Sequence, residues 1–249
     1  MGRKKNTVGH HLKHYCYILN VADEAEIKPC GYQLEKVLGQ LTALADKKKA
    51  RNNKYDRYFC YGKKTPSATT LAEIHAKYPR SSYVLDLPFW DIFDCNNSSM
   101  AFYEEQLIKM PADIKKHLFP MYTPDKLKEI ITRRNINSIV RIGSPHALAC
   151  VLALYRLNED EKSVLRVEGN IVGALEHLLE MCCIQSPLDK IPGELVETVG
   201  RFLNAKIERP DDYIVLSSRE TFIYYVTVFR ALFEGLRRWH ITEGNNDEI

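Results

Sequence analysis

The sequence predicts an all-α protein with two regions of opposite charge. Two observations predict the helices: apolar residues recur three and four positions apart in several stretches, and Ser/Thr-Pro pairs precede some of these stretches. A third observation predicts the division into regions. Residues 1–80 carry 16 Lys or Arg and 7 Asp or Glu, whereas residues 81–249 carry 19 and 25, so their net charges are +9 and −6. A basic region beside an acidic one suggests two different kinds of partner.

The composition excludes several classes of protein. Of 249 residues, 45% are hydrophobic and 27% are charged, which is typical of a globular chain with a buried core. No apolar run reaches the roughly 18–20 residues that cross a bilayer, and the basic N-terminus lacks the apolar stretch of a signal peptide. The seven cysteines include no C-x-x-C pair, which predicts free thiols. We therefore expect a cytoplasmic protein with no membrane partner.

Residues 1–62 are predicted to begin with an ambiguous segment followed by two helices. Residues 15–21 fit either a short helix or a strand. From Gln33 onward the pattern is helical, and one apolar stripe contains Leu34, Val37, Leu38, Leu41, Leu44 and Ala45. A second, short helix is expected to run through Tyr55 and Tyr58 to Gly62, with Asn52 or Asn53 as its cap.

The next helix and the end of the basic region follow from prolines and polar residues. Thr65 is the predicted N-cap of this helix, with Pro66 in its first position and its end before Pro79. The Asn/Ser-rich segment at 96–99 predicts a domain boundary, which gives domains of residues 1–96 and 97–249.

An aromatic group lies just before this boundary. It consists of Phe89, Trp90 and Phe93. We expect these rings to close the core of the first domain. The alternative is that they bind a protein partner, since Trp is common in binding hot spots.

The second domain is predicted to be a helical bundle. Thr123-Pro124 and Ser144-Pro145 each combine a capping hydroxyl with a following proline, so each predicts the start of a helix. The first helix is expected to pass through Leu127, Ile130 and Ile131. Further apolar stripes cover residues 148–155, 164–182 and 195–203.

The last predicted helix, residues 222–236, is apolar on more than one face. Ile223, Tyr224 and Val228 lie off its main stripe, which contains Phe222, Tyr225, Val226, Phe229, Phe233 and Leu236. Such a helix is either central to a bundle or part of a subunit interface. We expect the central position.

The densest positive charge lies in residues 47–64, which contain eight basic residues and one acid. A helix that reads DNA needs Lys and Arg near phosphates, together with polar side chains that reach base edges. Both kinds of residue are present, and Tyr55, Tyr58 and Phe59 would anchor the segment to its domain. The candidate nucleic-acid-binding residues are Lys47, Lys48, Lys49, Arg51, Asn52, Asn53, Lys54, Arg57, Lys63 and Lys64.

Residues 59–74 carry a resemblance to a known motif. An aromatic residue lies three positions before a glycine, Pro-Ser follows four positions after that glycine, and a Leu-x-x-Ile pair comes next. The residues are Phe59, Gly62, Pro66, Ser67, Leu71 and Ile74. This stretch resembles the latter half of the Cro/repressor-type helix-turn-helix, and residues 40–45 are similar to the Gln-x-x-x-Leu-Ala of that family.

The resemblance covers about residues 40–75 and implies a small helix-turn-helix-like domain that binds DNA. By this resemblance, residues 52–57 lie in or near the recognition helix. The chain departs from the family in the turn between the two central helices. There the family has a Gly or small residue and an apolar residue, whereas residues 49–52 read Lys-Ala-Arg-Asn.

The sequence therefore favours a DNA-binding protein whose partner is double-stranded DNA. The role that we expect is a transcriptional regulator or DNA-targeting accessory factor of a bacterial or mobile-element system, where the bacterial setting is implied only by the resemblance. Self-association through the C-terminal helices would place two small modules on two half-sites. The alternative is a helical adaptor or scaffold that binds another protein through its basic face and aromatic patch. A solvated basic face and RNA binding also account for the charge.

No enzyme activity, cofactor or metal is expected. The chain has no Walker loop and no G-x-G-x-x-G, H-E-x-x-H or G-x-S-x-G motif. His146 and Cys150 lie one helical turn apart, but Cys150 belongs to an apolar helix in which an inert thiol is expected. The densest set of potential metal ligands, which matches no standard zinc spacing, is His10, His11, His14 and Cys16.

Overall fold

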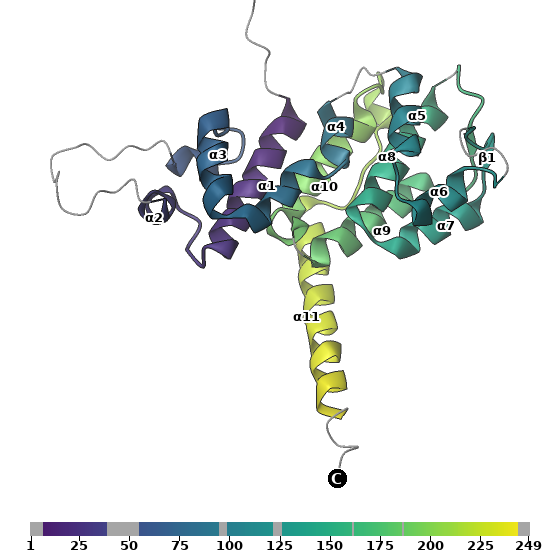
Figure 1. Ribbon diagram of the computed structural model, residues 1–249. Helices are drawn as coiled ribbons and strands as arrows, with labels where there is room; N and C mark the ends of the chain where they lie inside the picture. The colour runs from purple at the N-terminus through teal and green to yellow at the C-terminus, as the bar shows by residue number, and fades with distance from the viewer. Residues whose placement is uncertain are drawn as a thin grey trace, which may run out of the picture. The chain divides into compact units, whose positions relative to one another are not determined.

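The structure is a computed structural model, and it describes residues 7–38, 55–94, 99–121, 126–160, 162–185 and 187–243 (Figure 1). The contacts divide the chain into two compact units, Met1–Asn96 and Asn97–Ile249. In the described residues both units consist mainly of helices, and each of the two strands is two residues long. The predicted all-α class is confirmed.

Helix α1 (Val8–Glu24) is the central element of unit 1. Its N-cap residue Thr7 accepts a hydrogen bond from the His10 amide at 3.2 Å. The helix contacts several other elements of its unit, so Cys16, Tyr17 and Ile18 are all fully buried although they are consecutive. A helix buried around most of its surface has no clear apolar stripe, which explains why the sequence left helix and strand open here.

The other elements of unit 1 are short. They are α2 (Gly31–Val37), the 3₁₀ helix η1 (Asp56–Phe59), α3 (Ala68–Lys77), the 3₁₀ helix η2 (Pro79–Asp86) and α4 (Phe89–Asp94). The predicted stripe of residues 33–45 is described only as far as Leu38, and its remainder lies outside the described residues. Helix α3 ends before Pro79, as predicted.

Helix α3 begins two residues later than predicted. Ser67, rather than Thr65, is its N-cap, because the Ser67 hydroxyl accepts a hydrogen bond from the Thr70 amide at 3.3 Å. The Ser67 and Thr70 hydroxyl oxygens are also 2.9 Å apart and share a hydrogen bond. This second bond stabilises the later start.

The aromatic group of α4 belongs to the core of unit 1. The exposed fractions of Phe89, Trp90 and Phe93 are 0%, 1% and 4%. The Trp90 indole nitrogen donates a hydrogen bond to the Val84 carbonyl oxygen at 2.6 Å, and α4 contacts α1. The alternative that these rings form a docking patch is wrong, because they offer no surface to a partner.

Unit 2 is arranged around helix α8. The elements are α5 (Met100–Ile108), α6 (Ala112–Leu118), β1 (Ile130–Ile131), α7 (Arg133–Ile142), α8 (Pro145–Glu159), β2 (Arg166–Val167), α9 (Ile171–Ile184), η3 (Leu188–Lys190), α10 (Pro192–Asn204), η4 (Pro210–Asp212) and α11 (Arg219–Glu243). Every residue of α8 from Ala147 to Leu157 is buried, and the helix contacts α5, α7 and α9. The predicted Ser144 cap is confirmed, since its hydroxyl accepts a hydrogen bond from the Ala147 amide at 3.2 Å.

Two residues of the predicted helix through Leu127 form a strand instead. Ile130 and Ile131 pair in parallel with Arg166 and Val167. The helix starts later, at α7, where Thr132 and Asn135 form a reciprocal capping box. The predicted start at Thr123-Pro124 lies outside the described residues. The stripe predicted to begin at Val164 likewise becomes helical only at Ile171.

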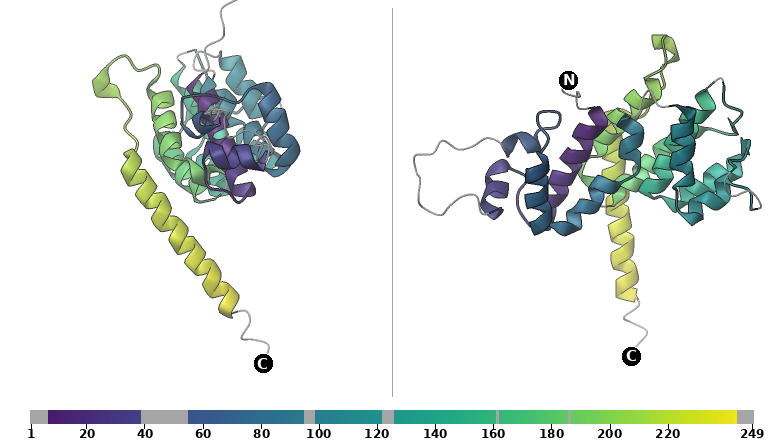
Figure 2. Two further views of the ribbon diagram at one scale, coloured as in Figure 1. Left: turned by 90° about the vertical axis from the view of Figure 1, so that its left-hand side faces the viewer. Right: turned by 45° about the horizontal axis from the view of Figure 1, so that its top comes forward.

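Helix α11 has 25 residues and extends beyond the helices that it contacts (Figures 1 and 2). Its first part packs against α9 and α10, where Phe222 and Val226 are 0% and 1% exposed. Most apolar side chains further along the helix are exposed. The predicted central position is therefore wrong, and α8 occupies the centre of unit 2.

Candidate functional site

Most of the basic segment predicted to bind DNA lies outside the described residues. This holds for Lys47, Lys48, Lys49, Arg51, Asn52, Asn53 and Lys54. The described members are Arg57, Lys63 and Lys64, and all three are exposed. None of these three side chains forms an ion pair with another described residue. Their positive charges are thus available to a partner.

The described residues on either side of positions 39–54 belong to two elements that contact each other. The chain leaves the described part after Leu38, at the end of α2, and enters it again at Tyr55, next to η1. Helices α2 and η1 pack closely at Gly31, where a Cβ atom would overlap the backbone of Tyr55 and Asp56. Only glycine permits this approach. The contact between α2 and η1 therefore holds Leu38 and Tyr55 in fixed positions, and we call this contact the fixed base of the basic segment.

The side chains of η1 point to opposite sides. Tyr55, just before it, and Tyr58 are 1% and 2% exposed, and their rings meet edge to face at 5.6 Å between centroids. Arg57 lies between them in the sequence and is exposed. The predicted anchoring by the two tyrosines is therefore present, with a basic side chain on the solvent side.

The helix predicted to reach Gly62 ends earlier, at Phe59, because residues 60–63 form a turn. Gly62 has a φ of +76°, a left-handed conformation that favours glycine, and the Lys63 amide donates to the Cys60 carbonyl at 3.0 Å. Lys63 and Lys64 thus belong to the connection between η1 and α3. The helix-turn-helix itself stays a prediction, since residues 39–54 lie outside the described part.

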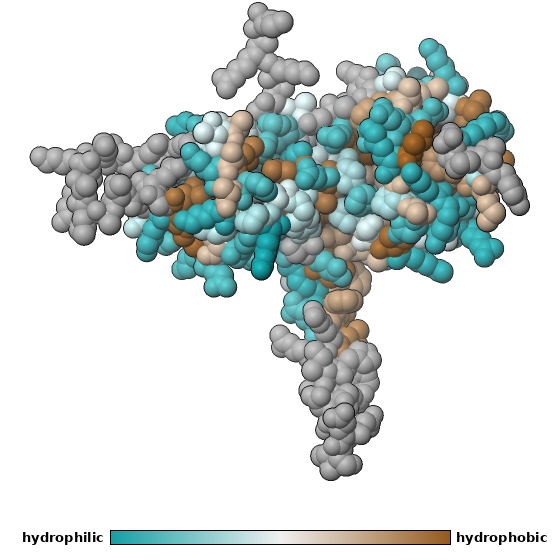
Figure 3. Space-filling view, in the orientation of Figure 1, coloured by the Kyte–Doolittle hydropathy of each residue, from teal (hydrophilic) through white to brown (hydrophobic). Residues whose placement is uncertain are grey.

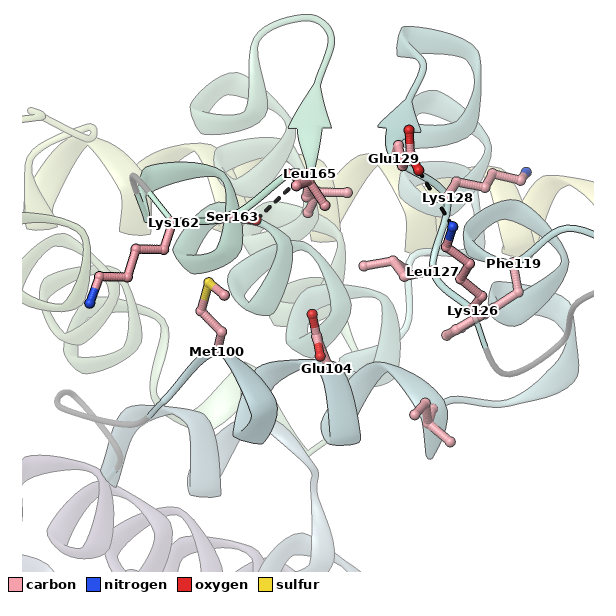
Figure 4. A pocket seen from close by; sticks show the side chains of 12 residues that line it. Met100, Glu104, Phe119, Lys126, Leu127, Lys128, Glu129, Lys162, Ser163 and Leu165 are labelled. Carbon is pink, nitrogen blue, oxygen red and sulfur yellow. Dashed lines mark hydrogen bonds and ion pairs between the residues drawn. The ribbon is translucent and has the colours of Figure 1, made fainter.

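Unit 2 contains a cavity of about 250 Å³ that the sequence did not indicate (Figure 4). Its wall comes from α5 and from the segments 126–129 and 162–165. Figure 4 shows Glu104 projecting from α5 toward this space. Two of its lysines already have partners: Lys126 is 3.5 Å from Glu129, and Lys128 donates to the His117 carbonyl at 3.0 Å. Phe119 also lines the cavity, so its wall comes from four separate parts of the chain that only the fold brings together.

The histidines and cysteines form no reactive or metal-binding group in the described part of the chain. Cys150 is fully buried, and burial raises the pKa of its thiol, which therefore stays protonated next to the exposed His146. Burial also lowers the pKa of His14 to about 4. Among the described residues, no three His, Cys, Asp or Glu side chains are placed to hold a metal ion. None of the six described cysteines forms a disulfide bond.

The exposed side of α11 is a second candidate site. Its six apolar side chains, each 37–58% exposed, are Tyr225, Val228, Phe229, Leu232, Phe233 and Leu236. At 100° per residue they span about 140° of the helix circumference. Figure 3 shows apolar side chains on the described part of this helix. Four of the six, Tyr225, Phe229, Phe233 and Leu236, belong to the predicted main stripe, and Val228 lies off it. The sequence had left a subunit interface as the alternative for this helix.

No protein-family model, no curated protein and no solved structure matches the chain. In the described residues, no helix combines the length and the apolar character required to span a bilayer.

Proposed function

We propose that the protein binds double-stranded DNA through residues 47–64, as a transcriptional regulator or DNA-targeting accessory factor of a bacterial or mobile-element system. The observation that carries this proposal is the cluster of eight basic residues next to a fixed base. The bacterial setting comes only from the resemblance to the Cro/repressor-type helix-turn-helix. The proposal includes a cytoplasmic location, with which the absence of disulfide bonds among the six described cysteines agrees.

The charges and amides of the segment suit two kinds of DNA contact. Lys and Arg neutralise phosphates and release counterions, so binding weakens as salt rises. If about five phosphates are neutralised, the logarithm of the binding constant falls with that of the salt concentration with a slope near −4 to −5. Asn52 and Asn53 supply side-chain amides of the kind that pair with adenine edges.

Fluorescence anisotropy on labelled random and genomic duplexes, measured across a salt series, tests the proposal. We expect salt-dependent binding by the wild-type chain and its loss in a Lys54→Glu/Arg57→Glu variant. The matched control is Lys28→Glu/Arg80→Glu, which makes the same change in net charge at two exposed positions of unit 1 outside the segment. An equal loss in both variants, or wild-type binding that does not respond to salt, would contradict the proposal.

The second candidate function is a helical adaptor that binds another protein. The buried rings of α4 no longer support it, but the exposed face of α11 does. If the protein is such an adaptor, the wild-type chain does not bind DNA, and the Lys54→Glu/Arg57→Glu variant still folds and binds the protein partner. The same anisotropy series therefore separates the two functions.

A further inference from the structure

Helix α11 carries an apolar face that its own unit leaves uncovered. Tyr225, Phe229, Leu232 and Leu236 are separated by four, three and four residues. Alternation of three and four is the spacing of the a and d positions in a coiled coil. All four side chains are between 43% and 58% exposed. The seam is therefore present, and about half of the surface of these side chains is left exposed.

The body of unit 2 holds the start of this helix in place. Arg219 makes ion pairs with Glu194 at 2.6 Å and with Glu197 at 3.2 Å, and Phe222 and Val226 face the core. These contacts fix which side of the helix faces inward.

Arg230, one helical turn after Val226, makes a further contact. Arg230 donates to the carbonyl oxygens of Cys183 at 2.8 Å and Asp189 at 3.2 Å. The helix cannot rotate its apolar face inward without breaking the Arg219 and Arg230 contacts. The face is thus held toward the outside.

The exposed area is sufficient for an interface. A fully buried aromatic side chain covers about 150–250 Å², so six half-exposed apolar side chains present about 600 Å² in total. A contiguous patch of that size is at the upper end of what a soluble monomer leaves exposed. Two such faces would bury about 1,200 Å² together, which reaches the lower limit of a standard specific interface.

We propose that the α11 face formed by Tyr225, Val228, Phe229, Leu232, Phe233 and Leu236 pairs with the same face of a second copy of this chain. A two-fold pair brings the same surface of both copies together, so a face with coiled-coil spacing is complementary to itself. The area matches what such a pair requires. This inference goes beyond nucleic-acid binding and does not depend on it.

Sedimentation velocity of the full chain over a concentration series tests the pairing. The wild-type chain is expected to have about twice its 28.8 kDa mass at high concentration. A Phe229→Glu/Leu236→Glu variant places charges in the seam, and we expect it to bind its second copy at least about 100-fold more weakly. The control, Thr227→Glu/Ala231→Glu, adds the same number of charges to the exposed opposite side of the helix and should stay within about threefold of wild type.

A wild-type chain that keeps the single-chain mass at every concentration would overturn the proposal, as would a seam variant that remains a dimer. Circular dichroism checks that the seam variant is folded. If it is not, Phe229→Ala/Leu236→Ala replaces it, with an expected weakening of about tenfold or more. Binding of a monomeric wild-type chain to uncharged lipid vesicles, lost in the Phe229→Glu/Leu236→Glu variant and kept in the Thr227→Glu/Ala231→Glu control, would also overturn the proposal and assign the face to a lipid surface.

Discussion

Helices α4 and α11 are both rich in aromatic residues, but one is buried and the other is largely exposed. Helix α4 has six residues and a length of about 9 Å, so α1 and neighbouring residues can cover its rings. Helix α11 has 25 residues and is about 37 Å long, whereas its neighbours α9 and α10 are only about 20 Å long. Composition alone does not decide whether an aromatic segment is core or interface. The length of the neighbouring elements does.

The largest effect is expected at the buried end of this comparison. Trp90→Ala removes a 1%-exposed ring together with its hydrogen bond to Val84, so we expect a loss of about 3–5 kcal/mol in the free energy of unfolding. Urea unfolding followed by circular dichroism measures this loss. Trp90→Phe keeps most of the ring and should lose only about 1–2 kcal/mol. A loss below about 1 kcal/mol for Trp90→Ala would place this ring outside the core.

A pH effect is expected on α1, which packs against α4. The pKa of His14 falls to about 4 in the folded chain, from an ordinary value of 6.5, because of burial and the nearby His10. Between these pH values the unfolded chain binds more protons, so unit 1 loses stability as the pH falls from about 6.5 to 4. The expected loss is about 2–3 kcal/mol, and stability is unaffected above pH 7.

Urea unfolding at pH 7.5 and pH 5 measures this dependence. His14→Gln should remove most of it, whereas His75→Gln, at an exposed position of α3, should leave it unchanged. A dependence that persists in His14→Gln belongs to other groups.

A smaller effect is expected at the anchor of α11. Arg219→Ala removes two ion pairs at a position whose side chain is 36% exposed, so solvent screens part of their energy. We expect a loss of about 1 kcal/mol in the stability of unit 2, measured by thermal unfolding at low and high salt. The neighbouring exposed residue provides the control, since Glu220→Ala should change stability by less than about 0.5 kcal/mol. No difference between the two variants would mean that the ion pairs contribute nothing.

The smallest effect is expected at the exposed end of the comparison. Phe233→Ser replaces a ring that is 52% exposed, so it should change the free energy of unfolding of a single chain by less than about 0.5 kcal/mol. Urea unfolding in the Phe229→Glu/Leu236→Glu background measures this value without a contribution from pairing. A loss above about 1.5 kcal/mol would show that the ring is covered by its own unit.

The sequence predicted the class of the fold because local signals determine many helices. Ser144 and Pro145 identify the start of α8 from two adjacent residues. The boundaries of other helices depend on contacts with residues far away in the sequence, which local patterns do not show. Ile130 and Ile131 have helical spacing relative to Leu127, but they pair with residues 36 positions later in the chain.

The candidate sites were predictable to different degrees. The basic residues of the segment proposed to bind DNA are visible in the sequence, whereas the Gly31 contact between α2 and η1 requires the fold. For α11, the sequence showed apolar residues on several faces, but it did not show that α9 and α10 end before α11 does. The cavity beside Glu104 was missed because its wall comes from segments far apart in the chain.

The two-residue pairing of β1 with β2 is expected to be a point of early local unfolding in unit 2. The Arg166 amide donates to the Glu129 carbonyl oxygen at 2.8 Å, and the Glu168 amide donates to the Ile131 carbonyl oxygen at 2.9 Å. Only two residues of each strand are paired. Local opening begins where the ladder is shortest, so these two amide protons should exchange with deuterium well before those of α8. Glu129 also lines the cavity, so exchange of these amide protons reports on the mobility of one part of the cavity wall.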